Sequence, residues 1–119
     1  MKVLHTDKAP AAVGPYSQAI EVNGFVFCSG QLPIDPATGV FAEGGVKEQT
    51  RQSILNAQEV LRSAGLELSN VAKTTVYLSD MDNFAAMNEV YAQFFSEPFP
   101  ARSAVAVKTL PKNALVEVE

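Results

Sequence analysis

The sequence contains few of the residues that catalyse reactions through a nucleophile or a metal ion. Its 119 residues include one histidine, His5, and one cysteine, Cys28. Structural zinc needs about four Cys or His ligands, so we expect no metal site. A Ser-His-Asp or Cys-His apparatus would have to use His5, which lies in a terminal segment of a kind that is usually mobile. Cys28 cannot form an intrachain disulfide, and we expect a small core residue in a reducing compartment.

Positive charge is also scarce. There are 9 Lys and Arg residues against 13 Asp and Glu residues, which gives a formal net charge of −4. A chain with this balance has no general electrostatic attraction for nucleic acids or anionic membranes. The sequence also lacks the apolar run of a signal peptide or of a membrane-spanning helix. We therefore expect a cytoplasmic protein without nucleic-acid or membrane partners.

The composition that is present is that of an ordinary globular protein. Hydrophobic residues make up 47% of the chain and charged residues 18%, which excludes a disordered chain. There is no internal repeat, low-complexity stretch or linker. We expect one domain over residues 1–119, because a chain of this length can form one core but has no room for a second.

Local patterns in the first half predict a hairpin followed by a helix. Asn23-Gly24 is a preferred pair for a type I′ turn, so the segments on either side of it should form a tight β-hairpin. Apolar or small residues recur every three or four positions over residues 46–64, which predicts an amphipathic helix. Gly65 directly follows and is expected to cap this helix.

The second half predicts a strand, a helix and two further strands. Residues 71–78 are rich in β-branched types. Asp80 or Asp82 can cap a second helix, whose stripe would carry Phe84, Met87, Tyr91 and Phe95. The last two strands are expected at about 102–107 and 115–119. This order is typical of an α+β fold with a mixed β-sheet.

Both faces of the predicted sheet are apolar, although only two helices are available to cover them. In the strand over residues 25–29, Phe25 and Phe27 point to one face, and Val26 and Cys28 point to the other. Helices on one face leave the other in contact with water unless a partner subunit buries it. We therefore expect a homo-oligomer, although long loops could instead cover the second face.

Several polar side chains occupy positions that have both a structural and a functional interpretation. Asn88 falls on the apolar stripe of the second helix, as a buried amide or a ligand contact. Arg102 opens a strand, either as a solvated edge charge or as a planar fork for a carboxylate. Glu117 points outward from the last strand, where it is either solvated or able to orient water and transfer a proton. Tyr16 and Ser29 are either structural or ligand contacts.

The chain resembles the reactive intermediate deaminase family, also called the RidA or YjgF family, over nearly its whole length. The most diagnostic segments are residues 100–103 (PARS) and 116–118 (VEV). The other matching segments are 9–19 (APAAVGPYSQA), 29–33 (SGQLP) with the turn 35–39 (DPATG), 49–53 (QTRQS) with Asn56, 73–78 (KTTVYL) and 88–91 (NEVY).

This resemblance implies a chorismate-mutase-like α+β fold, in which two helices cover one face of a mixed sheet and three chains form a homotrimer with ligand clefts between subunits. It also implies an activity in metabolite damage control. The substrates would be 2-aminoacrylate and 2-aminocrotonate, hydrolysed through the imines 2-iminopropanoate and 2-iminobutanoate to 2-oxo acids and ammonia. No cofactor is implied.

Carried over by position, Arg102 would bind the substrate carboxylate, and Glu117 would hold the attacking water and move protons towards the departing ammonia. The backbone of Ala104, where many relatives carry cysteine, would contact the substrate nitrogen or water. Relatives usually continue the final strand past the position of Glu119, which bears on how firmly Glu117 is held. The remaining residues implied to bind substrate are Tyr16, Ser29, Gly30 and Asn88.

Two other functions are compatible with parts of this pattern. A trimeric regulatory protein could use Arg102 to bind a 2-oxo acid or a similar carboxylate without turnover. Ribonuclease or translation-inhibitor activity is attributed to some relatives. The acidic balance and the lack of a basic aromatic surface argue against nucleic-acid chemistry in this chain.

Overall fold

The computed structural model describes residues 1–119 and contains the elements in the order that the sequence predicts. The one strand that sequence patterns missed is β1, whose three residues are too few to show a period. The helices and strands are β1 (Lys2–Leu4), β2 (Ala19–Val22), β3 (Phe25–Cys28), α1 (Val46–Arg62), η1 (Leu68–Asn70), β4 (Lys73–Leu78), η2 (Met81–Asn83), α2 (Phe84–Phe94), β5 (Ala101–Ala106), η3 (Pro111–Asn113) and β6 (Val116–Val118), where η denotes a 3₁₀-helix.

The strands form two small sheets. One is antiparallel, in the order β1-β2-β3, and the other has the order β5-β4-β6. In the second sheet β4 runs parallel to β5 and antiparallel to β6, so this sheet is mixed as predicted. The hairpin β2-β3, predicted to be part of the same sheet, instead forms the separate antiparallel one. The two sheets are bridged at Gln31 and Val118, whose backbones exchange hydrogen bonds of 2.8 and 3.1 Å. The bridge is short because β6 spans three residues.

Two turns form for the reasons that the sequence indicates. Asn23 and Gly24 have φ angles of 51° and 79°, as a type I′ turn requires, and they join β2 to β3. After α1, Gly65 has a φ of 74°. The Leu66 N–H then donates to the Leu61 carbonyl at 3.0 Å, which satisfies an end carbonyl of the helix.

The start of α2 differs from the prediction. Asp80 accepts a hydrogen bond of 2.8 Å from the Asp82 N–H, so it caps the short helix η2 rather than α2 itself. Asn83 is the cap residue of α2 and makes no side-chain capping bond. The chain needs no separate cap there because η2 leads directly into α2.

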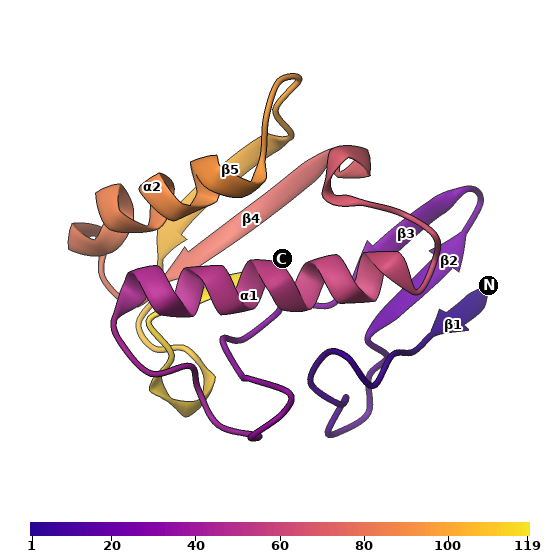
Figure 1. Ribbon diagram of the computed structural model, residues 1–119, viewed down its shortest axis with the longest axis horizontal. Helices are drawn as coiled ribbons and strands as arrows, with labels where there is room; N and C mark the ends of the chain where they lie inside the picture. The colour runs from indigo at the N-terminus through magenta and orange to yellow at the C-terminus, as the bar shows by residue number, and fades with distance from the viewer.

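Both α-helices lie on the same side of the strands, as expected (Figure 1). The opposite face carries exposed apolar side chains in the single chain, where Phe25 and Phe27 are 65% and 62% exposed and Val105 is 44% exposed. The apolar second face inferred from the alternation is present only in part, because the same face of β4 and β5 also carries Lys73 and Ser103, which are hydrogen-bonded at 3.2 Å. None of the helices has the length and apolar character needed to cross a membrane.

Helix α1 holds two loops through buried amides. Asn56, which is 1% exposed, donates hydrogen bonds to the carbonyls of Leu32 and Ile34 at 3.1 and 2.8 Å. Gln49 accepts one from the Leu115 N–H at 2.8 Å. The first pair fixes the chain just after Gly30, and the second fixes the entry to β6. The helix therefore fixes both segments that meet at Glu117.

We predict that Asn56→Leu lowers the free energy of unfolding by about 3 kcal/mol, because two carbonyls lose their buried partner and each unpaired group costs about 1–3 kcal/mol. Urea unfolding followed by circular dichroism measures this change. Gln58→Leu on the same helix is the control, since Gln58 is only partly buried. Equal effects of the two variants would contradict the assignment of Asn56 as a structural anchor.

Candidate active site

Arg102 lies on the face of the sheet that the helices cover. It is paired in register with Thr74 of β4, and residues paired across neighbouring strands point to the same face. Thr74 is 4% exposed and contacts Tyr91 of α2. The Arg102 Nη1 donates a hydrogen bond of 2.7 Å to Oδ1 of Asn88, also on α2. The two residues that sequence patterns marked as ambiguous are thus direct partners.

The Arg102 guanidinium is held by aromatic rings and has no anionic partner in the chain. Its Cζ lies 4.7 Å from the ring centroid of Tyr91 and 5.5 Å from that of Phe84. None of the ion pairs involves Arg102. A half-buried, planar cation without a carboxylate partner is suited to bind a carboxylate supplied from outside. We call Arg102, Asn88, Tyr91 and Phe84 the cation group.

Glu117 lies on the other face. Val116 and Val118 are 0% and 3% exposed and belong to the core beneath the helices, so alternation turns Glu117 away from them. Its side chain lies against Gly30. A methyl group at Gly30 would overlap Oε1 of Glu117, and therefore only glycine leaves room for the carboxylate in this position.

Ser29 directly precedes Gly30 in the chain and connects it to the loop before β2, which carries Tyr16. Ser29 donates a hydrogen bond of 2.6 Å from Oγ to the carbonyl of Ser17, which anchors the segment that carries Tyr16. The Tyr16 side chain is exposed, and its hydroxyl accepts a hydrogen bond from the Val13 N–H at 3.4 Å. We call Glu117, Gly30, Ser29 and Tyr16 the carboxylate group.

The environment of Glu117 favours its protonated form. Burial raises the pKa of Glu117, and the negative charge of Glu119 raises it further. A carboxylate with a raised pKa is a stronger base than an ordinary glutamate and is therefore better suited to accept a proton.

Ala104 presents its backbone at the free edge of β5. The N–H groups of Ala101 and Val107 donate to the carbonyls of Ala72, just before β4, and Leu78, at its end. Alternate residues along β5 therefore bond to β4, and the backbone groups of those between them point away. The N–H and carbonyl of Ala104 consequently face outward along the edge. Its side chain packs against the core, which leaves the backbone as the part available to a ligand.

The cation group and the carboxylate group are separated within one chain. Arg102 is on β5 and Glu117 on β6, at the two edges of a sheet with β4 between them. Two strand spacings amount to about 9.5 Å, and the side chains also point to opposite faces. A small molecule therefore cannot contact Arg102 and Glu117 of the same chain at once.

Comparison with known proteins agrees with this arrangement of motifs. The family profile described as Endoribonuclease L-PSP matches residues 6–119. The chain is 47% identical to a solved structure of RidA from the Antarctic bacterium Psychrobacter sp. PAMC 21119, with a TM-score of 0.95 over 99% of this chain and 95% of that one. The chain belongs to the RidA (YjgF) family.

RidA-family relatives carry two kinds of name. A RutC family protein of Pyrococcus abyssi is 52% identical over 99% of this chain and 93% of its own length. The 2-iminobutanoate/2-iminopropanoate deaminase of Capra hircus is 48% identical over 99% of this chain and 86% of its own length. The family thus includes imine deaminases at close to half identity.

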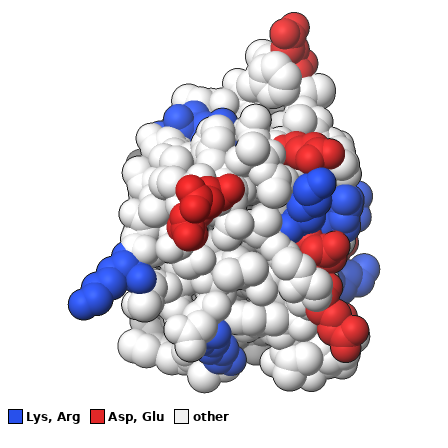
Figure 2. Space-filling view, turned by 90° about the vertical axis from the view of Figure 1, so that its left-hand side faces the viewer, with Lys and Arg blue, Asp and Glu red and all other residues white.

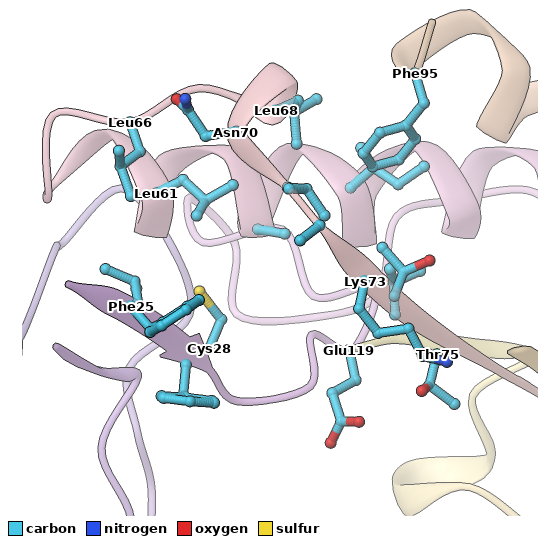
Figure 3. A pocket seen from close by; sticks show the side chains of 18 of the residues that line it. Phe25, Cys28, Leu61, Leu66, Leu68, Asn70, Lys73, Thr75, Phe95 and Glu119 are labelled. Atoms are coloured by element: carbon cyan, nitrogen blue, oxygen red, sulfur yellow. The ribbon is translucent and has the colours of Figure 1, made fainter. Parts of the chain in front are cut away.

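One cavity is lined by residues outside both groups. It has a volume of about 840 Å³ and is mainly apolar, between β3 on one side and β4 on the other, with α1 behind it. Figure 3 shows Phe25 and Cys28 facing Lys73 and Thr75 across it. Burial raises the pKa of the Cys28 thiol, which keeps the thiol protonated and unreactive. This cavity is therefore not the candidate active site.

Sequence patterns did not predict that Phe84 and Tyr91 contact Arg102. The apolar stripe of α2 predicted both residues as buried, and in the structure both rings lie against the Arg102 guanidinium. The signal was their spacing from Asn88, because residues 84, 88 and 91 share one face of a helix.

No group of three or more His, Cys, Asp or Glu side chains is placed to hold a metal ion.

We predict that Glu119→Gln lowers the pKa of Glu117, because it removes a neighbouring negative charge. Burial still acts, so the pKa should stay above its ordinary value. Carbon-13 NMR titration of the glutamate carboxyl signals measures the change. Glu89→Gln is the control, since Glu89 is paired with Lys47 on the surface. An unchanged Glu117 pKa in the Glu119 variant would exclude this charge coupling.

Proposed function

We propose that this protein hydrolyses 2-imino acids, among them 2-iminopropanoate and 2-iminobutanoate, to 2-oxo acids and ammonia. The observation that carries the proposal is the pair of incomplete groups, an Arg102 cation without an anion and a Glu117 carboxyl with a raised pKa. The names of relatives at close to half identity support the choice of substrate. Neither group requires a cofactor for this reaction.

In this mechanism, Arg102 binds the substrate carboxylate through its guanidinium, with Asn88 holding Nη1. The imine reacts in its protonated form. Glu117 orients a water molecule against the C=N carbon and accepts a proton from it as the C–O bond forms and the C=N π electrons move to nitrogen. The resulting carbinolamine carries an amino group, and Glu117 returns the proton to this nitrogen. The C–N bond then breaks as the carbinol hydroxyl transfers its proton to Glu117, which releases ammonia and leaves the 2-oxo acid. Glu117 then loses the proton to water or ammonia. Imines hydrolyse readily in water, so positioning and one carboxylate provide the required acceleration.

Because one chain cannot bring Arg102 and Glu117 together, the proposed site lies between two copies of the chain. The cation group and the Ala104 backbone come from one copy, and the carboxylate group, with Tyr16, Ser29 and Gly30, comes from another. The exposed Phe25, Phe27 and Val105 on the uncovered face favour such assembly. We propose a homotrimer with three equivalent clefts, as the family resemblance implies.

The surface gives less support to nucleic-acid chemistry, despite the endoribonuclease description of the family profile. On the face drawn in Figure 2, Lys and Arg side chains alternate with Asp and Glu along one edge and form no continuous basic surface. The net charge of −4 disfavours binding to a polyanion.

Carboxylate binding without turnover is the second candidate function, because Arg102 could bind a carboxylate equally well in a protein that catalyses no reaction.

We predict that this protein accelerates imine hydrolysis and that Arg102→Ala abolishes the acceleration. A threonine dehydratase or an amino-acid oxidase generates the imine, and semicarbazide competes with hydrolysis to form a semicarbazone that absorbs light. Wild-type protein should reduce semicarbazone formation in proportion to its concentration. Glu117→Gln should slow turnover while retaining binding of 2-oxobutanoate. Arg51→Ala is the matched control, since Arg51 stacks on Phe94 away from the site.

The outcomes of this assay separate the two candidate functions. No change in semicarbazone at any concentration of wild-type protein, together with 2-oxobutanoate binding, would favour the regulatory protein. Full activity of Arg102→Ala in a protein of unchanged assembly would remove Arg102 from the site.

We also predict that inactive Arg102→Ala chains and slowed Glu117→Gln chains recover activity when their subunits are mixed. In an equal mixture, half of the subunits supply an intact Arg102 and the other half supply an intact Glu117. About a quarter of the clefts then hold both residues, whatever the number of subunits in a symmetric assembly. Turnover after refolding the two chains together measures this fraction, with the separately refolded chains as controls. A site contained within one chain would give no recovery.

A further inference from the structure

Tyr91 makes a polar contact that its packing alone does not require. It is 6% exposed, and its ring stacks on Phe95 with centroids 4.4 Å apart. Its hydroxyl nevertheless lies 2.8 Å from Oγ1 of Thr74, which is also buried. A phenylalanine and a valine would fill similar volumes without two buried hydroxyls, so the hydrogen bond has another use than filling the core.

The hydrogen bond fixes the ring on which Arg102 lies. Thr74 is the register partner of Arg102 on the neighbouring strand, and the Arg102 Cζ is 4.7 Å from the centroid of the Tyr91 ring. The Tyr91 hydroxyl is therefore hydrogen-bonded to Thr74, while its ring contacts Arg102, the register partner of Thr74. These two contacts fix the orientation of the ring relative to the sheet, and the ring in turn restricts the plane of the guanidinium.

Asn88 supplies the second constraint on Arg102. Contact with a fixed ring restricts the plane of the guanidinium, and the 2.7 Å hydrogen bond from Nη1 to Asn88 restricts its rotation within that plane. The remaining N–H donors then point in a defined direction. A preorganised arginine binds a carboxylate more tightly than a free one, because less side-chain freedom is lost on binding.

We propose that Tyr91 is a positioning residue, which aims the Arg102 guanidinium at the substrate carboxylate through its ring contact and its hydrogen bond to Thr74. The inference rests on the proposed role of Arg102 and extends it to a residue that touches no substrate. Tyr91 acts on carboxylate binding, which is present in the ground state and the transition state alike. Its loss should therefore raise KM and leave kcat nearly unchanged.

The test compares Tyr91→Leu, which removes the ring, with Tyr91→Phe, which removes only the hydroxyl. Titration calorimetry with 2-oxobutanoate measures carboxylate binding without turnover. We expect the dissociation constant to rise about tenfold for Tyr91→Leu and about threefold for Tyr91→Phe, as loss of a desolvated cation–π contact and of one hydrogen bond would produce. Thr74→Val should match Tyr91→Phe, and the double variant should be no weaker than either single one.

The matched control is Phe94→Leu, which removes another aromatic ring of α2 that lies under a different arginine, Arg51. It should bind 2-oxobutanoate as tightly as wild type. Order parameters from nitrogen-15 relaxation of the Arg102 Nε–H give a second measurement. They should fall in Tyr91→Phe and stay unchanged in Phe94→Leu, which a general loosening of α2 would not produce.

Each outcome decides the proposal. Wild-type affinity in Tyr91→Leu overturns it and leaves the proposed function intact. If Tyr91→Leu does not fold, unchanged affinity and unchanged Arg102 order in Tyr91→Phe overturn it. The expected binding pattern in a protein that hydrolyses no imine supports the positioning role and rejects the deaminase. No binding of 2-oxobutanoate by the wild-type protein overturns the positioning role, whereas the semicarbazone assay alone decides the deaminase.

Discussion

Alternation of side chains across β5, β4 and β6, with helices on one face only, decides where each chemical group of this protein lies. Val116 and Val118 pack beneath the helices, and this packing leaves Glu117 on the open face. A slip of one residue in β6 would bury the carboxylate and expose both valines, at the cost of their burial. The packing that stabilises the core therefore also determines the position of the Glu117 carboxylate.

Each helix supports one half of the proposed chemistry. Helix α1 fixes the segments around Gly30 and Glu117 through Asn56 and Gln49, whereas α2 provides the residues that surround Arg102. Both helices lie on the same face of the fold (Figure 1). A cleft formed between two copies would therefore be built from α1-supported groups of one chain and α2-supported groups of the other.

The sequence predicts what depends on local chemistry and periodicity. The turn at Asn23 and Gly24 and the outward position of Glu117 are confirmed because each follows from a few neighbouring residues. The separation of Arg102 from Glu117 required the pairing of β4 with β5, which joins residues about thirty positions apart and leaves no local pattern. The contact between Tyr91 and Arg102 also depends on how α2 crosses the sheet. An apolar stripe on a helix predicts which side chains are buried but not which residues they contact.

Assembly of the proposed kind would act on both halves of the site at once. Closing the uncovered face against a second copy removes water from Glu117, and desolvation is already the larger cause of its raised pKa. The same loss of water strengthens the attraction between Arg102 and a carboxylate, because the local dielectric constant falls. Binding and proton transfer would then improve together only in the assembled protein, since the isolated chain leaves its uncovered face open to water. In the proposed assembly, oligomerisation would in this sense be part of the catalytic apparatus.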